Sequence, residues 1–229
     1  MAHTSEPTST IDRSDPSPSE LWKGLQSPLT FGLISCGGIG ALLFTAVYLI
    51  EGFTRPGYDA WLQAIAALSL GPGGWVQQVN FIVYGILLAL SAVGWYRLLA
   101  PGRNAIWFPL LQGIGGLCLI GIGVISVLTL LHIILAWALI LSLALGCGAL
   151  AEQFRSVLHW RGWSVYSYIT FFLILIFWGA FQQGASGNVG WLVPITGLVE
   201  RLSAESHSLW LCVLVVALFF KRASQRSPN

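Results

Sequence analysis

Six long apolar stretches separated by short polar segments dominate the pattern of the chain. They run approximately over residues 29–50, 77–98, 106–127, 130–151, 164–182 and 207–221. A helix needs about 20 apolar residues to cross the hydrocarbon core of a bilayer, and most of these stretches have that length. The third and fourth stretches nearly touch at residues 126–131. A single helix over both would be about twice as long as the bilayer is thick, so we expect a tight hairpin there. The pattern predicts an all-α, polytopic membrane protein, a bundle of six transmembrane helices.

Two shorter amphipathic segments precede the second and the sixth stretch. Asp59 can cap a helix over residues 60–70, which glycine and proline at residues 71–74 would end. Pro194 can begin a second helix, with an apolar stripe formed by Ile195, Leu198, Val199 and Leu202. Both segments predict short interfacial helices on the outer face of the bundle.

The ends of the chain differ in composition from the apolar body. Residues 1–28 are rich in serine, threonine, proline and acidic residues, and they contain too little apolar surface to fold. They also lack the basic start and apolar core of a cleavable signal peptide. We therefore divide the chain into a disordered cytoplasmic tail (1–28), a six-helix transmembrane domain (29–221) and a cytoplasmic C-terminal tail (222–229).

Composition narrows the class of protein further. The chain is 55% hydrophobic and only 9% charged, with a mean hydropathy of +0.75, whereas soluble domains carry about 25% charged residues. The formal net charge is only +2 and no basic run contains interleaved aromatics, so nucleic acid is excluded as a partner. No phosphate-binding loop, dinucleotide fingerprint or pair of intramembrane histidines suitable for haem occurs, and we expect no cofactor.

The basic residues predict the orientation in the membrane. Nine of the eleven fall on one side of the six-span topology: Arg13, Lys23, Arg97, Arg103, Arg155, Arg161, Lys221, Arg222 and Arg226. Only Arg55 and Arg201 fall on the opposite side. The positive-inside rule therefore places both termini in the cytoplasm.

Polar residues gather at the predicted outer end and supply the candidate ligand-binding side chains. These are Arg55, Tyr58, Asp59, Gln77, Asn80, His132, Glu200 and Arg201. Asp59, His132 and Glu200 are also candidates for acid–base catalysis. The alternative is structural: ion pairs that tie loops to helix ends, and hydrogen bonds between helices. No histidine or acidic pair has the spacing of a metal site, so no metal is expected.

The outer-end motifs resemble a prokaryotic membrane family known as domain of unknown function family 998. The resemblance is carried by GFTRPGYD at residues 52–59, LSLGPGGWVQ at 68–77, then Asn80, Phe81 and Gly85. It extends through His132 and into residues 197–201, and so covers roughly residues 30–220. The chain departs from the family pattern at Ala60 and Ala66 and lacks an acidic loop before His132. The resemblance implies a six-helix bundle in the cytoplasmic (inner) membrane and no particular activity.

Three functions are compatible with these features. The favoured hypothesis is a non-enzymatic protein that binds a lipid or small amphiphile at its outer end, as a sensor or partner subunit. The alternative is an outer-leaflet intramembrane hydrolase or lipid-modifying enzyme, and the third is a small secondary transporter. The expected partners are membrane lipid, a small amphiphilic ligand and a second copy docked through glycine-rich helix faces. One such face of the third span carries Gly113, Gly116 and Gly123.

Overall fold

The computed structural model describes residues 24–99, 105–125, 127–155 and 160–226, which form helices and no strand. Six helices are long and apolar enough to cross a membrane. The α-helices are α2 (Pro28–Thr54), α3 (Trp75–Leu99), α4 (Trp107–Val124), α5 (Leu130–Arg155), α6 (Arg161–Ala185) and α7 (Thr196–Arg226). Two short 3₁₀ helices, η1 (Ile65–Ser69) and η3 (Gly190–Ile195), join them. The predicted all-α bundle of six membrane-spanning helices is therefore confirmed.

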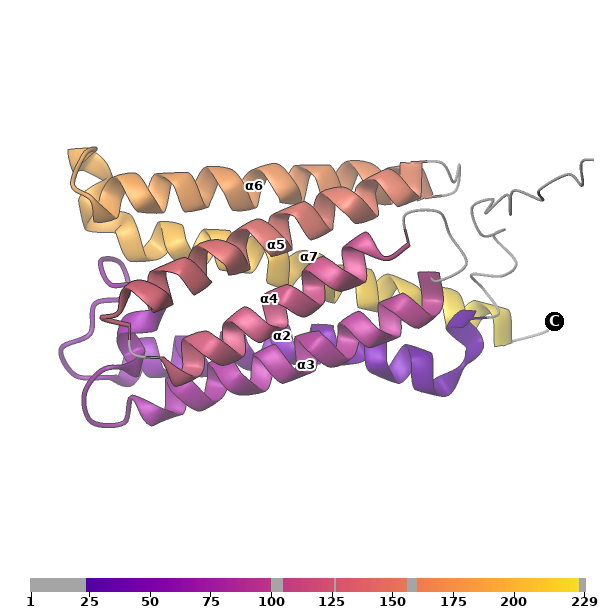
Figure 1. The fold of residues 1–229 in the computed structure, drawn as a ribbon, viewed down its shortest axis with the longest axis horizontal. Helices are drawn as coiled ribbons and strands as arrows, with labels where there is room; N and C mark the ends of the chain where they lie inside the picture. The colour runs from indigo at the N-terminus through magenta and orange to yellow at the C-terminus, as the bar shows by residue number, and fades with distance from the viewer. Residues whose placement is uncertain (1–23, 100–104, 126, 156–159, 227–229) are drawn as a thin grey trace, which may run out of the picture.

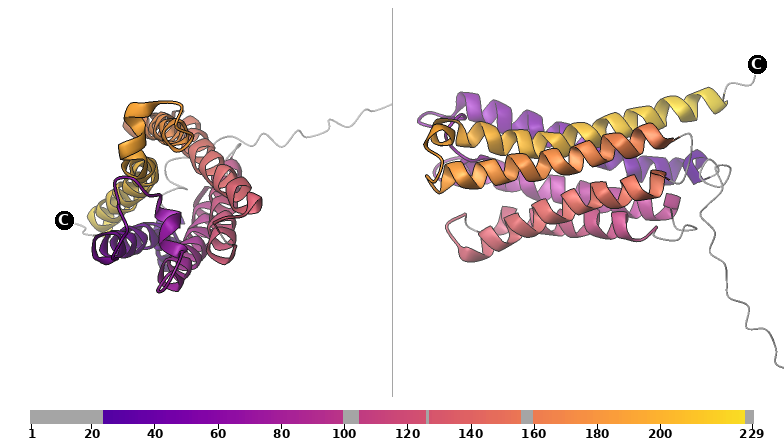
Figure 2. Two further views of the ribbon diagram at one scale, coloured as in Figure 1. Left: turned by 90° about the vertical axis from the view of Figure 1, so that its left-hand side faces the viewer. Right: turned by 90° about the horizontal axis from the view of Figure 1, so that it is seen from above.

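The six helices form a ring in which each one packs against its neighbours in the sequence, and α7 returns to pack against α2. Figure 2 shows this ring from one end. Figure 1 shows the helices running side by side, with η1, η3 and the α4–α5 turn together at one end, which we call the loop end. The start of α2 and the end of α7 lie at the other, terminal end.

Large aromatic side chains fill the centre of the ring toward the terminal end. Trp95 and Trp210 are almost fully buried, and Phe108 packs edge-on against both, with ring centroids 5.3 Å and 5.8 Å away. The indole of Trp210 donates a hydrogen bond to the Ser167 hydroxyl at 3.0 Å, which satisfies its buried polar group. Large apolar side chains such as Leu117 and Ile176 are exposed on the outside, as expected of helices solvated by lipid.

Glycines let α3 and α4 approach closely. A Cβ atom added to Gly85 would lie 2.5 Å from the Gly116 carbonyl oxygen, and one added to Gly123 would lie 2.7 Å from the Gln78 carbonyl oxygen. Small residues commonly serve this purpose between transmembrane helices. Gly116 and Gly123 thus pack within one chain. A homo-oligomer that docks through α4 stays a prediction. Among Gly113, Gly116 and Gly123, only Gly113 has no atom closer than 3.7 Å to an added Cβ atom.

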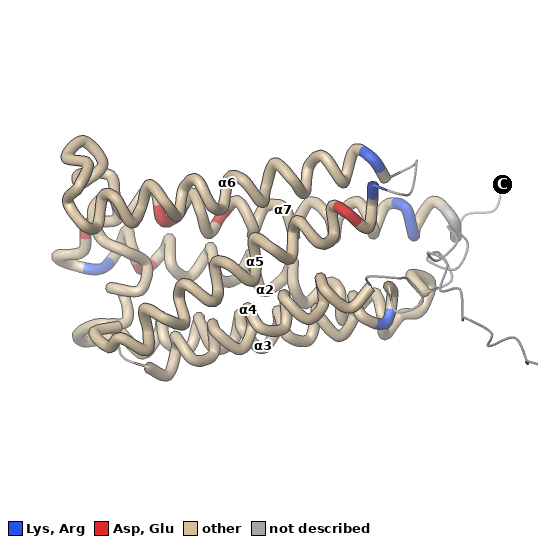
Figure 3. The backbone as a smooth tube through the Cα atoms, turned by 45° about the horizontal axis from the view of Figure 1, so that its top comes forward, with Lys and Arg blue, Asp and Glu red and all other residues tan. Residues whose placement is uncertain are grey.

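The positions of the charged residues along the backbone are unevenly distributed between the two ends of the bundle (Figure 3). The basic residues at the terminal end are Arg97, Arg155, Arg161, Lys221 and Arg222, whereas those at the loop end are Arg55 and Arg201. Arg226 ends α7 at the terminal end, and Arg13, Lys23 and Arg103 lie outside the described residues. The described basic residues therefore lie at the two ends of the bundle in the way that the six-span topology requires.

The two predicted interfacial helices differ in form from the expectation. The first is a turn followed by the 3₁₀ helix η1. The carbonyl oxygens of Ala60 and Gln63, which would accept backbone N–H groups in an α-helix, accept hydrogen bonds from Arg201 instead. The second is not separate: α7 begins at Thr196 and continues unbroken through the last span. The sixth membrane helix therefore begins well before residue 207.

Both ends of the ordered body extend beyond the predicted domain limits. Gly24 begins a helical turn, Leu25 is 1% exposed, and the Ser27 hydroxyl caps α2 by accepting a hydrogen bond from the Thr30 N–H. At the other end α7 runs to Arg226. The rest of the predicted N-terminal tail, residues 1–23, lies outside the described residues.

Candidate functional site

A cavity of about 100 Å³ lies inside the ring in its loop-end half. One water molecule needs roughly 10–15 Å³ of such space, so several waters or an alkyl segment would fit. Aliphatic side chains and the rings of Phe44, Phe81, Tyr84 and Trp178 form most of its wall. The polar side chains that reach it are His132, Glu200, Ser203, His207 and Ser208. The cavity is therefore an apolar chamber with a few polar groups, which is typical of sites for small ligands.

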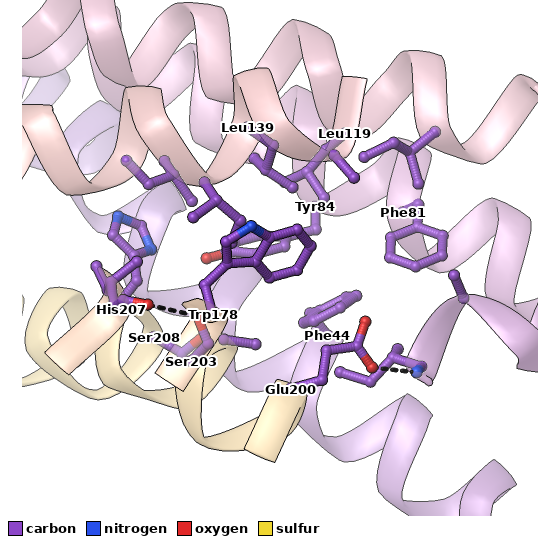
Figure 4. Close-up of a pocket in the computed structure, with 18 of the residues that line it drawn as sticks. Phe44, Phe81, Tyr84, Leu119, Leu139, Trp178, Glu200, Ser203, His207 and Ser208 are labelled. Atoms are coloured by element: carbon purple, nitrogen blue, oxygen red, sulfur yellow. Dashed lines mark hydrogen bonds between the residues drawn. The ribbon is translucent and has the colours of Figure 1, made fainter. Parts of the chain in front are cut away.

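The first turns of α7 supply most of the polar wall. Glu200, Ser203 and His207 are spaced three and four residues apart, so they lie on one face of the helix. Figure 4 shows this face turned toward the aromatic rings across the cavity. The Ser203 hydroxyl donates a hydrogen bond to the Ile174 carbonyl oxygen at 3.1 Å. This bond ties α7 to α6 beside the cavity.

Glu200 places one carboxylate oxygen in the cavity. Its Oε2 accepts a hydrogen bond from the Ile65 N–H at 2.6 Å, so the start of η1 fixes the side chain. The other oxygen is turned toward the space beside Phe44 (Figure 4) and has no hydrogen bond or ion pair among the described residues. A ligand in the cavity would therefore meet a free carboxylate oxygen.

Two buried histidines border the same cavity from different helices. His207, 3% exposed, packs against Trp210 with ring centroids 5.7 Å apart, and its imidazole has no hydrogen-bond partner among the described residues. His132, 6% exposed, lies at the start of α5 with Nδ1 3.2 Å from the Ile125 carbonyl oxygen. His132 is thus anchored to the α4–α5 turn, whereas the imidazole of His207 is held by packing alone among the described residues.

Arg201 braces the loop end next to the cavity. It is 8% exposed and donates to the carbonyl oxygens of Ala60 (2.7 Å), Gln63 (3.0 Å) and Gly197 (2.8 Å). It also donates to the Tyr58 hydroxyl. Burial raises the pKa of Tyr58 and outweighs the opposing effect of the Arg201 charge. Both residues therefore fix the first loop onto α7.

The Arg55–Asp59 motif also has structural contacts. Arg55 donates to the carbonyl oxygens of Leu68 and Leu70 and forms an ion pair with Glu51 at 3.2 Å. Asp59 is exposed, and its Oδ1 accepts a hydrogen bond from the Trp61 N–H at 2.9 Å. Neither residue lines the cavity. Of the three acid–base candidates, the structure brings His132 and Glu200 to one cavity and leaves Asp59 outside it.

Gln77 and Asn80 connect α3 to α2. The Asn80 side-chain amide donates to the Phe44 carbonyl oxygen at 3.1 Å and to the Gln77 side-chain oxygen at 3.2 Å. The Gln77 amide nitrogen is buried without a partner among the described residues. The pair positions Phe44 and Phe81 in the cavity wall and does not itself reach the cavity.

The hydrogen bonds of the polar side chains limit the chemistry that is possible at the cavity. No hydrogen bond joins either histidine to a carboxylate or a serine hydroxyl within the described ranges. Nor do the described residues contain a group of three or more histidine, cysteine or acidic side chains that could hold a metal ion. What the arrangement offers is an apolar space, a carboxylate oxygen and an imidazole.

Several cavity residues were not among the sequence candidates: Tyr84, Trp178, Ser203, His207 and Ser208. The signal that could have identified three of them is the polar stripe of Glu200, Ser203 and His207 at helical spacing. That stripe can be recognised only if the last helix is taken to start near Thr196, where α7 begins in the structure. Beginning it at residue 207 separated Glu200 from His207.

Comparison with known proteins places the chain in a family but gives no activity. The family model DUF998, described as a protein of unknown function, matches residues 38–217. The matched region includes every residue that lines the cavity. No curated protein and no solved structure is significantly similar to the chain.

Proposed function

We propose that this chain, a multi-pass membrane protein that belongs to the DUF998 family of unknown function, binds a small amphiphile in the cavity at the loop end. The observation that carries the proposal is the pairing of an apolar chamber with a carboxylate oxygen of Glu200 that no described residue engages. The apolar wall would accept an alkyl or ring segment, and the stripe on α7 would accept the polar head. In this role the protein acts as a sensor or as a partner subunit.

Selectivity in such a site must come mainly from its polar groups. An apolar ligand gains little by moving from lipid tails to an apolar protein wall, because both are equally free of water. A polar head group that enters the cavity leaves the water and lipid head groups of the interface, so protein groups must replace those hydrogen bonds. Glu200 and His207 lie two helical turns apart, roughly 10 Å along α7. They thus mark the two ends of the polar wall.

A binding role requires only the chamber, whereas the hydrolase alternative requires a base within hydrogen-bond reach of the group that it activates. His132 has its Nδ1 beside the Ile125 carbonyl oxygen, and His207 packs on Trp210. Neither contact activates a nucleophile. The geometry therefore supports binding better than hydrolysis.

Filling the cavity is expected to remove the ligand. Ala136 lines the chamber from α5, and Ala136→Phe would occupy its space without changing charge. Native mass spectrometry of protein extracted from its own membranes should show the bound amphiphile with the wild type and little of it with the variant. Ala46→Phe is the matched control, because Ala46 lies in α2 with its side chain exposed. Equal amounts of ligand on wild type, Ala136→Phe and Ala46→Phe would refute the proposal.

We further propose that the terminal end faces the cytoplasm of a cell whose inner membrane holds the protein. The basic side chains gathered at that end support this orientation. With the native cysteines replaced by alanine, Ser186→Cys at the loop end should react with an impermeant maleimide in intact cells. Ser224→Cys near the end of α7 should react only after permeabilisation; both serines are exposed. The reverse labelling pattern would show that the orientation is wrong.

A further inference from the structure

We infer, as an extension that rests on the binding proposed above, that the polar head of the ligand is an organic cation. The chemical class is an amphiphilic amine or quaternary ammonium, seated between the free oxygen of Glu200 and the aromatic side chains of the cavity. Three features of the loop-end half carry this assignment: the pairing of Glu200, the rings around it, and the balance of charge.

The carboxylate of Glu200 forms no direct ion pair with a basic side chain among the described residues, and the charge of Arg201 acts on it only through space. The ion pairs found among the described residues join Arg55 to Glu51 and Arg155 to Glu152. Arg201, the next residue along α7, directs its guanidinium to backbone carbonyls and the Tyr58 hydroxyl. Because a carboxylate in an apolar chamber is costly unless it is paired, a cationic ligand would supply the missing partner.

Aromatic side chains surround the space that the carboxylate faces. Phe44 lies beside Glu200, while Trp178, Phe81 and Tyr84 border the cavity further from it (Figure 4). Phe44 packs against Phe81 and Tyr84 with ring centroids 5.6 Å and 5.0 Å away, so the three rings form one continuous wall. Aromatic walls attract ammonium groups through the negative faces of the rings, and they are the usual environment for quaternary ammonium ligands.

By formal charge, the described residues of the loop-end half are net negative. Its described acidic residues are Glu51, Asp59, Glu200 and Glu205, against the basic residues Arg55 and Arg201. Glu205 accepts hydrogen bonds from Thr45 and Tyr48 hydroxyls at 2.7 Å and has no basic partner within the described ranges. The field at this end of the bundle therefore favours cations and opposes anionic head groups.

A metal ion is a poorer fit for the same position. Metal ions in proteins are held by three or more ligands, and no such cluster occurs in the described part of the chain. The wall facing Glu200 consists of hydrocarbon and aromatic rings, which suits an organic cation with an apolar body.

The test compares two probes of nearly equal size on the full-length protein in nanodiscs. Dodecyltrimethylammonium carries a positive charge, whereas dodecyldimethylamine N-oxide has the same chain and no net charge at neutral pH. Calorimetric titration, corrected with empty nanodiscs, should show that the wild type binds the cation roughly tenfold more tightly than the amine oxide. Glu200→Gln, which keeps the acceptor for the Ile65 N–H, should bring the two affinities to about the same value.

Two control variants separate the possible failures. Glu152→Gln changes an exposed acidic residue at the terminal end and should leave the preference unchanged. If Ala136→Phe abolishes binding of both probes but Glu200→Gln alters neither, the cavity binds amphiphiles and the inference of a cation is wrong. If Ala136→Phe alters neither probe, the cavity is not the binding site, and the proposed function is wrong as well.

Discussion

Replacing Arg201 with leucine is expected to destabilise the protein by about 3–5 kcal/mol, the cost typical of removing one partner from a buried charged network. The reason is that Arg201→Leu removes the donors to three backbone carbonyl oxygens, those of Ala60, Gln63 and Gly197. Buried acceptors without donors each carry a desolvation penalty. The first loop would detach from α7, and η1 would no longer hold Glu200 in place.

The measurement is the thermal unfolding midpoint in nanodiscs, followed by tryptophan fluorescence. A loss of this size should lower the midpoint by roughly 6–20 °C. Arg155→Leu is the matched control, because the Arg155 side chain is 70% exposed and pairs with Glu152 only at the surface. Its cost should stay below about 1 kcal/mol. Equal midpoints for the two variants would contradict the role given to Arg201.

Replacing Gly85 with alanine should cost about 3 kcal/mol, at the upper end of the range for overpacked sites. The new methyl group would lie 2.5 Å from the Gly116 carbonyl oxygen and 2.9 Å from the Ile120 backbone nitrogen. Backbone atoms cannot turn away as a flexible side chain can, so Gly85→Ala must push α3 and α4 apart. We expect a lower unfolding midpoint and a lower yield of folded protein from the membrane.

Gly113→Ala supplies the control on the same pair of helices. Its methyl group would lie 3.7 Å from the Ala92 Cβ atom, an ordinary contact. The stability should therefore change by less than about 1 kcal/mol, with a small gain from helix propensity. Should Gly113→Ala prove as damaging as Gly85→Ala, the close packing of α3 on α4 would not be the cause of either effect.

The membrane-spanning helices were predictable because their physical cause is local. An apolar stretch of bilayer length must be helical in lipid, since its backbone groups have no other partner there. The start of α7 was not predictable in this way. Residues 196–206 include Glu200, Arg201 and Glu205, so they lower the apolar character of a helix that is continuous in the structure. Their partners come from α2 and the first loop, which hydropathy does not reveal.

The candidate site was predictable only in part for a similar reason. The dense polar motif from Arg55 to Asp59 attracted attention by composition, but its side chains contact backbone groups of their own loop and the side chains of Glu51 and Arg201. Sequence does not distinguish a side chain that closes a loop from one that meets a ligand. His132 and Glu200, both chosen from the sequence, border the same chamber in the structure, and His207 is placed there by the ring of helices.

The most direct test of the central claim is an experimental structure of the protein purified in native lipid. The predicted result is elongated density inside the ring, bounded by Phe44 and Trp178, with its polar end against the free oxygen of Glu200. A chamber that is closed by side chains, or that holds only water while lipid density lies solely on the outer surface, would contradict the claim that the protein binds an amphiphile there.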